Sequence, residues 1–359
     1  MSALTTVLLA FSLLGALDRI LGCPLGIGRE FDRAFMLIGT MALSMIGMII
    51  LAPALGIWLK PMFALFYDVF RIDPSVIPAS LFANDMGGAS LALEVTENAG
   101  VGAFNAYVVS SMMGCVISFT IPFAGGIVDS SQHKELFLGF LYGIVTIPIG
   151  CVAAGFLCGL TPLEIVLDLL PLILISGVIA VGLILTPDRC IKIFRLFGKL
   201  MTVLITVGLA LGIFTFLSGK TVFVGLDTIE NGMSICLSAA VTLSGAFPLM
   251  HVVGRLLGKP MSAVGSKIGI NGTSALALIP TLVTNATAFG MMKDMDRKGV
   301  VLNSAFAVSA AFVFGSHLGF TMAFDERYVA PMIVAKLVSG VSALLLALLL
   351  YREKPAQSA

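Results

Sequence analysis

The chain has 359 residues, of which 58% are hydrophobic and only 11% are charged. Soluble domains carry about 25% charged residues, so this composition excludes a water-covered globular domain and favours a surface that faces lipid. The net charge of +1 gives no indication of a nucleic-acid partner.

Eleven apolar segments follow one another along the chain, and a helix of about 20 such residues crosses a bilayer. The connections are short, so we expect an all-α polytopic membrane protein with no soluble domain. The first segment resembles a signal peptide, but no basic residue precedes it and Asp18-Arg19 interrupts its end, so we interpret it as a span. The segments are residues 2–22, 34–58, 74–98, 104–128, 136–159, 163–186, 199–218, 231–251, 268–292, 302–323 and 329–351.

Two of these segments are too polar to be ordinary spans. We predict that each is a re-entrant hairpin, because non-helical backbone at membrane depth is tolerated only inside protein or beside a cavity. Their polar or helix-breaking residues are Asn84, Asp85, Gly87, Gly88, Glu94, Glu97 and Asn98 in the first, and Asn271, Gly272, Thr273, Pro280, Thr284, Asn285 and Thr287 in the second.

The basic residues support this topology, because cytoplasmic loops are enriched in Lys and Arg. If all eleven segments cross, the nineteen basic residues outside them divide eleven to eight between the two sides. If the two polar segments are hairpins, the division becomes fifteen to four. The sequence therefore favours nine spans and two hairpins, with the N-terminus outside and the C-terminus in the cytoplasm. The minority side holds Lys60, Arg71, Lys220 and Arg327.

The predicted topology makes the two halves of the chain inverted copies of each other. Ser80-Leu81-Phe82-Ala83-Asn84 parallels Thr281-Leu282-Val283-Thr284-Asn285, although chance similarity between apolar segments is the alternative. Inverted repeats with interrupted helices are a recurring transporter plan, with substrate bound near the midplane. The units would be residues 1–162, a linking span and basic cytoplasmic loop at 163–198, an inverted repeat at 199–351, and a polar tail at 352–359.

Asp85 is the strongest candidate for function, because a carboxylate at membrane depth costs roughly 3 kcal/mol or more. It could bind a cationic substrate, a coupling cation or a proton. The alternative is a structural ion pair between Asp85 and Lys336. Lys336 could also extend its ammonium group to the membrane surface, which is called snorkelling. The adjacent Gly87 and Gly88 would let backbone approach a ligand.

Other polar residues could join the site or simply hydrogen-bond between helices. We expect Asn84 and Asn285 to face each other across the repeat axis. His317 could relay a proton or be a hydrogen-bonded bundle histidine. Further substrate-binding candidates are Met86, Thr284, Ser110 and Ser111, with Asn303 and Ser304 as weaker ones and Glu94 with Lys336 as a structural or coupling pair.

Motifs for other chemistry do not occur in the sequence. A phosphate-binding loop, a metalloprotease H-E-x-x-H and a nucleophile G-x-S-x-G are missing, so we predict neither ATP-driven transport nor an enzyme. The six cysteines follow no disulfide or metal-ligand spacing, and we expect them to be core residues without metal or cofactor.

Several stretches spread over most of the chain carry a family resemblance. They include Asp85-Met86-Gly87-Gly88, residues 143–151, residues 305–312, His317-Leu318-Gly319-Phe320 and residues 331–337. On these stretches the chain resembles the ethanolamine-utilisation permeases, the EutH family. The resemblance implies uptake of ethanolamine across the bacterial inner membrane, where alternating access is our mechanistic hypothesis. The chain departs from the family pattern at Ser316, because in that pattern an acidic residue stands directly before the histidine.

Other functions compatible with the sequence are an ion-coupled carrier of another small amine or of an anionic metabolite, and a membrane enzyme or receptor-like component without flux. Flux could be passive or coupled to H⁺ or Na⁺. We expect a homodimer, which is common among carriers of this plan.

Overall fold

A computed structural model describes residues 2–351, and every element among them is helical. The expected polar tail, residues 352–359, lies outside this range. The α-helices are α1 (Ala3–Ile20), α2 (Ile27–Met36), α3 (Ile38–Phe70), α4 (Val76–Leu81), α5 (Gly88–Val95), α6 (Ala99–Phe104), α7 (Ile121–Ile127), α8 (His133–Leu157), α9 (Pro162–Leu185), α10 (Pro187–Ser218), α11 (Ile229–Ile268), α12 (Gly272–Thr281), α13 (Asn285–Met291), α14 (Arg297–Ala310), α15 (Ser316–Phe324) and α16 (Val329–Leu350). Between them lie the 3-10 helices η1 (Asn84–Met86), η4 (Ser130–Gln132), η5 (Met292–Asp294) and η6 (Glu326–Tyr328), and the π-helices η2 (Asn105–Gly114) and η3 (Val116–Thr120).

Eight continuous helical stretches in the described part are long and apolar enough to cross a membrane. Their outward faces are apolar, as on α9, where Leu174 is 69% and Val178 is 73% exposed. Such a surface suits lipid, and the chain is therefore a multi-pass membrane protein. The stretches are Ala3–Ile20, Ile27–Phe70, Ala99–Ile127, Ser130–Leu157, Pro162–Leu185, Pro187–Ser218, Ile229–Ile268 and Glu326–Leu350.

These stretches match eight of the nine predicted spans. The ninth, predicted over residues 302–323, is instead two helices, α14 and α15, separated by a non-helical stretch at 311–315. The predicted basic loop after α9 is also different, because α10 begins at Pro187 and its basic residues are helical. Pro187 stands in the first turn, where a missing backbone N–H removes no hydrogen bond.

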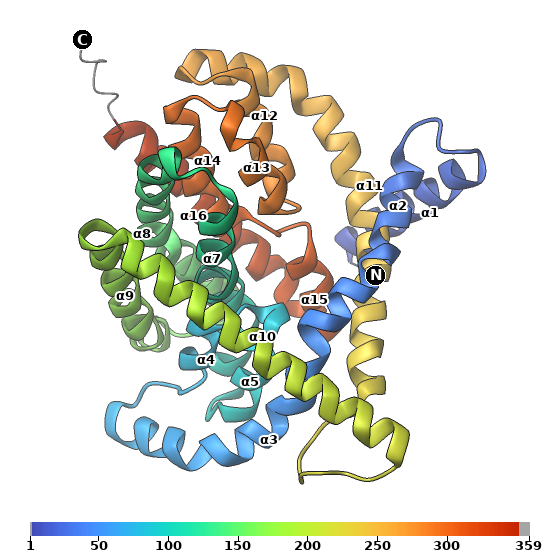
Figure 1. Cartoon of the computed structure of the whole chain (residues 1–359), viewed down its shortest axis with the longest axis vertical. Coiled ribbons are helices and arrows are strands. Elements are labelled where there is room, and N and C mark those ends of the chain that lie inside the picture. Colours follow the sequence, from blue (N-terminus) through green and yellow to red (C-terminus); the bar gives the residue numbers. More distant parts are fainter. Residues whose placement is uncertain (1, 352–359) are drawn as a thin grey trace.

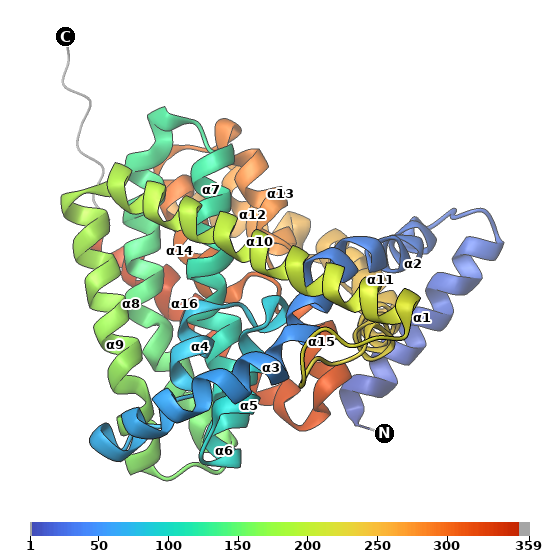
Figure 2. The ribbon, with the colours of Figure 1, turned by 60° about the horizontal axis from the view of Figure 1, so that its bottom comes forward.

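The helices form two groups (Figure 1). In one, α8 packs against α14 and α16, with α9 on its outer side; in the other, α1, α2 and α3 pack with α11. The long helix α10 runs diagonally across the molecule and contacts both α3 and α9 (Figure 2). The two hairpins and the broken helix lie between these groups.

Small residues on α8 allow its close packing. A Cβ added to Gly150 would lie 2.1 Å from the Ala335 carbonyl oxygen, and one added to Gly143 would lie 2.4 Å from Val308 Cβ. Ser339 of α16 also accepts a hydrogen bond from the Gly150 backbone N–H at 3.1 Å. Glycine at such positions lets membrane helices approach until their backbones touch.

The first polar segment is a hairpin whose two ends meet at one aspartate. Asp73, just before α4, accepts hydrogen bonds from the backbone N–H groups of Glu97 at 3.0 Å and Asn98 at 2.9 Å, just after α5. The chain therefore returns to its starting point instead of crossing, as the sequence predicted.

The second polar segment closes in the same way, with its aspartate at the other end. Asp296, after α13, accepts from the Asn271 backbone N–H at 2.9 Å and from the Ser274 hydroxyl at 2.7 Å. In both views α12 and α13 lie toward the upper end of the molecule and α4 and α5 toward the lower end (Figures 1 and 2). The two hairpins thus enter from opposite ends.

Candidate functional site

The tip of the first hairpin is an extended stretch followed by a tight turn. Phe82 and Ala83 are extended, η1 follows, and Gly87 has a φ of +99° before α5 begins. The turn is closed by a hydrogen bond from the Gly88 backbone N–H to the Ala83 carbonyl at 2.9 Å. A Cβ on Gly87 would lie 2.6 Å from Met48. The double glycine is therefore needed to build the tip, and neither glycine lines the cavity described below.

The tip of the second hairpin pairs with the break between α14 and α15. The backbone N–H of Phe314 donates to the Leu282 carbonyl at 2.8 Å, and that of Phe312 to the Thr281 carbonyl at 3.3 Å. Phe312 has a φ of +65°, a left-handed conformation that strains a bulky residue. Such strain persists only where surrounding structure enforces it, and it clusters at functional sites.

A cavity of about 290 Å³ lies between the two tips and the broken helix. Asp85 from the first tip and His317 from the start of α15 are its central polar pair, with 3.8 Å between Asp85 Oδ1 and His317 Nε2. Ser316 lies beside the same carboxylate. The remaining lining residues are Arg33, Leu37, Thr40, Met41, Ser44, Ala83, Met86, Cys115, Phe119, Phe247, Val283, Thr284 and Phe312.

Aromatic rings supply much of the rest of the wall. The Phe312 ring lies 5.1 Å from the His317 ring and 5.6 Å from that of Phe119, centroid to centroid. The faces of such rings attract cations. A carboxylate among aromatic rings favours a small cation with a polar end over an anion.

Lys336 does not serve as the partner of Asp85, contrary to one of our expectations. It is 1% exposed, which also excludes snorkelling, and its ammonium donates to the Ser111 carbonyl at 2.7 Å. Among the described residues the basic side chain within 4 Å of the Asp85 carboxylate is His317, at 3.8 Å, and Lys336 acts on Asp85 electrostatically from farther away. Asp85 therefore keeps an oxygen-rich face toward the cavity.

The two asparagines predicted to face each other contact threonines instead. Asn84 Nδ2 lies 3.5 Å from the Thr321 hydroxyl, and Asn285 Nδ2 lies 3.3 Å from the Thr120 hydroxyl. Both asparagines are fully buried and line no wall of the cavity. Each fastens one hairpin to the opposite half of the chain.

The remaining candidates also lie outside the cavity. Ser110 donates to the Ala106 carbonyl and Ser111 to the Val108 carbonyl, so both hydroxyls bond to their own helix. Glu94 is exposed and does not meet Lys336. Asn303 is buried and donates to the carbonyls of Ser274 and Gly299, and Ser304 is buried beside Gly139. Of the predicted substrate-binding residues, Asp85, Met86, Thr284 and His317 line the cavity.

Sequence reasoning missed several lining residues, chiefly Arg33, Phe247, Phe312 and Ser316. Ser316 could have been identified from the sequence, because it departs from the family pattern directly before His317. Phe247 and Phe312 gave no local signal, because an apolar run does not reveal which phenylalanine faces a cavity. Arg33 directly precedes the predicted span 34–58, where a basic residue is typical of a cytoplasmic loop.

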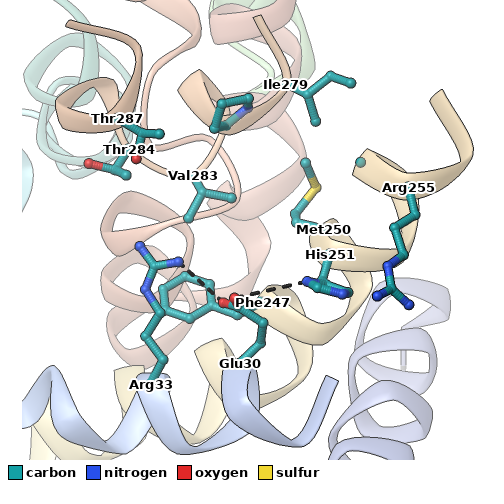
Figure 3. A pocket seen from close by; sticks show the side chains of 12 residues that line it. Glu30, Arg33, Phe247, Met250, His251, Arg255, Ile279, Val283, Thr284 and Thr287 are labelled. Atoms are coloured by element: carbon teal, nitrogen blue, oxygen red, sulfur yellow. Dashed lines mark hydrogen bonds and ion pairs between the residues drawn. The ribbon is translucent and has the colours of Figure 1, made fainter. Parts of the chain in front are cut away.

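A second cavity of about 340 Å³ adjoins the first and shares Arg33, Phe247, Val283 and Thr284 with it (Figure 3). At its edge Glu30 lies 3.2 Å from the Arg33 guanidinium and 4.0 Å from His251 Nδ1. The Arg33 guanidinium also sits 5.3 Å above the centre of the Phe247 ring. This charged cluster stands where the two cavities join.

These features define a multi-pass, all-α membrane protein with a polar cavity between two opposed hairpin tips. The chain also matches the family model described as "Ethanolamine utilisation protein, EutH" over residues 2–350. It therefore belongs to the EutH family, as its sequence motifs suggested.

Curated relatives agree with this assignment. The chain is 41% identical to a probable ethanolamine permease of Listeria monocytogenes, over 94% of this chain and 90% of the relative. It is 36% identical to the probable ethanolamine permease of Escherichia coli, over 98% and 95% of the two chains. A Bacillus subtilis relative described as uncharacterized is 38% identical over 95% and 92%. The relatives that carry a functional name are thus named as probable permeases and not as enzymes, and no solved structure matches the chain.

Proposed function

We propose that this protein imports ethanolamine, as the ammonium ion, across the bacterial inner membrane by alternating access. The observation that carries the proposal is the Asp85 carboxylate, held beside His317 in a cavity walled by aromatic rings. The names of the relatives support the solute, and the basic-residue distribution supports an outside N-terminus and a cytoplasmic C-terminus.

The cavity chemistry suits both ends of ethanolamine. The molecule is a primary ammonium with one hydroxyl, and its cation crosses hydrocarbon poorly because leaving water is costly. Asp85 would replace the water around the ammonium, with the Phe312 and Phe119 rings beside it. Ser316 and Thr284 offer hydroxyls for the other end. At about 30 Å³ per water, the cavity also has room for several waters around so small a solute.

Matching contacts in the two halves support an inverted repeat as the basis of the movement. A Cβ on Gly114 would lie 2.0 Å from the Phe82 carbonyl oxygen, and one on Gly315 would lie 2.1 Å from that of Val283. Both glycines thus hold a hairpin tip against the helix that follows it. The glycines have the same sequence separation as Phe82 and Val283.

The asparagine–threonine contacts repeat that separation. It relates Asn84 to Asn285 and Thr120 to Thr321, so each hairpin contacts the opposite half at an equivalent point. We infer that the tips move together with the group formed by α8, α9, α14 and α16, relative to the group formed by α1, α2, α3 and α11. The movement would expose the cavity to each side in turn.

The second cavity provides a route of release. Arg33 stands at the junction, where its positive charge opposes the passage of an ammonium ion, and Glu30 at 3.2 Å offsets that charge. In the proposed topology this end faces the cytoplasm. The structure would then correspond to a state open toward the cytoplasm.

Uptake of radiolabelled ethanolamine into proteoliposomes tests the proposal, with mildly acidic medium outside to keep the membrane-permeable free base scarce. We expect uptake above that of empty vesicles. Loss of a hydrogen bond to a charged group costs about 1.5–3 kcal/mol, so Asp85→Asn should weaken binding by about 10-fold to 150-fold.

Glu94→Gln is the matched control, because it removes a carboxylate from the same hairpin at an exposed position outside the cavity. It should leave affinity unchanged. Wild-type flux no greater than that of empty vesicles would refute transport, and equal affinities of Asp85→Asn and wild type would remove Asp85 from the site.

A further inference from the structure

A buried carboxylate lies near the base of the first hairpin, away from the cavity. Asp168, in the second turn of α9, is 2% exposed, and Asn105 of η2 is fully buried beside it. Asn105 Nδ2 donates to Asp168 Oδ1 at 2.8 Å and to the Ser75 hydroxyl at 2.9 Å. Ser75 in turn donates its hydroxyl to Asp73. This base network, Asp73–Ser75–Asn105–Asp168, plays no part in the proposed binding of substrate.

The two carboxylates of the base network differ sharply in their partners. Asp73 accepts from the backbone N–H groups of Ser75 at 2.9 Å, Glu97 at 3.0 Å and Asn98 at 2.9 Å, and from the hydroxyls of Ser75 and Thr96. Five donors stabilise a negative charge.

Asp168 has one such donor, Asn105. Its second oxygen, Oδ2, has no hydrogen-bond partner among the described residues, and neither does Asn105 Oδ1. A buried carboxylate with one donor is poorly supported as an ion. When two carboxylates share a network, the environment that stabilises one ion leaves the proton on the other.

The titratable groups around Asp168 strengthen this assignment. Asp73 at the hairpin base acts on Asp168 electrostatically, Asp168 in turn acts on Cys151 of α8, and on its own helix Glu164 lies one turn away. None of these three groups is a cation. A negative Asp168 would therefore face a second negative charge on Asp73 with no compensating positive charge in the base network.

We propose that Asp168 is a proton-binding site, with Oδ2 as the atom that carries the proton, and that its protonation couples ethanolamine uptake to the inward flow of protons. The inference rests on the proposed function. In the binding step hydronium gives a proton to the carboxylate, leaving a carboxylic acid and water; release is the reverse. The unpaired Asn105 Oδ1 is an acceptor that the new O–H can use once the amide turns.

The base network has a path to water and a link to the substrate site. Asn98, at the exposed end of the hairpin, donates to Glu164 at 3.3 Å, and Glu164 lies four residues before Asp168 on α9. Residues with that spacing share a helix face, so the proton has a short route inward. On the other side Ser75 directly precedes α4, which leads to the tip that carries Asp85.

A proton fits this place better than a sodium ion. Sodium needs several oxygen ligands at once, whereas the group that touches Asp168 Oδ1 is an amide N–H donor. The Ser75 hydroxyl hydrogen is already directed to Asp73. One proton on Oδ2 neutralises the charge, and the rearrangement that it requires is the turn of the Asn105 amide.

Proteoliposomes with a clamped membrane potential test the coupling. One pH unit is worth about 1.36 kcal/mol per proton, so an outside medium one unit more acidic should raise wild-type accumulation up to about tenfold. Asp168→Asn, which mimics the neutral acid, should keep ethanolamine counterflow but lose this response. Passive movement of the free base has the opposite sign, because the amine collects on the acidic side, and empty vesicles measure it.

Asp188→Asn, the same chemical change at an exposed position on α10, is the matched control and should respond as wild type does. A full pH response in Asp168→Asn overturns the inference. So does wild-type accumulation that follows a sodium gradient and ignores the pH gradient. Absence of wild-type counterflow instead refutes the proposed function.

Infrared spectroscopy tests the proton itself, without transport. The purified protein should show the C=O stretch of a buried protonated carboxylic acid at neutral pH. The band should be lost in Asp168→Asn and kept in Asp73→Asn. A spectrum unchanged by Asp168→Asn would overturn the assignment even if the protein proves to be a transporter.

Discussion

Replacing Gly315 by alanine should separate the second hairpin tip from the broken helix. The new Cβ would lie 2.1 Å from the Val283 carbonyl oxygen, whereas ordinary contact begins near 3.4 Å. The two backbones must therefore part by about 1.3 Å (3.4 − 2.1), which would break the neighbouring 2.8 Å hydrogen bond from Phe314 N–H to the Leu282 carbonyl. Overpacking costs about 1–3 kcal/mol and an unpaired buried backbone group a further 1–3 kcal/mol, together about 2–6 kcal/mol.

Thermal unfolding of the purified variants and ethanolamine uptake measure this effect. At about 2 °C per kcal/mol, we expect the Tm of Gly315→Ala to fall by about 4–12 °C, with uptake strongly reduced. The control is Gly290→Ala on α13, where a Cβ meets no atom within 4 Å. If both variants melt and transport alike, the contact between tip and broken helix does not exist as described.

Three further predictions follow from single contacts. Asp73→Ala removes the acceptor for three backbone N–H groups, so we expect a loss of about 3–5 kcal/mol in unfolding free energy and faster proteolysis after residue 73; wild-type protease resistance would contradict this. Glu30→Gln leaves the Arg33 charge unopposed at the junction of the cavities, so uptake should slow by about tenfold and recover in the double variant with Arg33→Gln; no recovery would argue against an electrostatic barrier. Asp325 lies outside the spans, and its hydrogen bonds from Arg327 hold the pKa of its carboxyl below the ordinary 3.8. The pair therefore contributes to folding stability above pH 3.8, and this contribution is lost as pH falls through the lower pKa of the folded state. It amounts to at most about 1 kcal/mol, because Arg327 is exposed to solvent. The Tm difference between wild type and Asp325→Asn should therefore disappear in acid, and a difference that grows there would contradict the assignment.

The hairpins were predictable because polarity and topology both pointed to them. Charged and amide side chains in two apolar segments needed a protein interior, and the basic residues favoured a return to the same side. The aspartates that close the hairpins, Asp73 and Asp296, were not recognised. Each lies at a segment boundary, where an acidic residue is equally typical of an exposed loop.

The broken helix was not predictable from local sequence. Residues 311–315, Ala-Phe-Val-Phe-Gly, contain no proline and a single glycine at their end, and their apolar character fits a continuous span. The helix breaks because Phe312 and Phe314 donate their backbone N–H groups to carbonyls of the hairpin tip. Tertiary pairing of this kind overrides helix propensity, and no pattern within the segment reveals it.

The structure places the predicted ionisable residues Asp85 and His317 at the cavity, whereas the two asparagines that were expected to face each other lie apart. Asp85 and His317 stood out because ionisable groups at membrane depth need a reason. Asn84 and Asn285 were matched as equivalents in the predicted repeat, but equivalence does not make two residues neighbours. In a two-fold arrangement each can contact the other half, here Thr321 and Thr120, without meeting its counterpart.

The proposed repeat explains the scaffold, and departures from it explain the chemistry. Contacts that position the tips recur at the separation that relates Asn84 to Asn285. At that same separation the counterpart of Asp85 is Ala286, and the counterpart of His317 is Val116. The ionisable pair at the cavity thus occurs in one copy only, so a single solute can bind off the axis while equivalent contacts hold both tips. Selection for solute chemistry can then act on Asp85, Ser316 and His317 without disturbing the contacts that the two halves share.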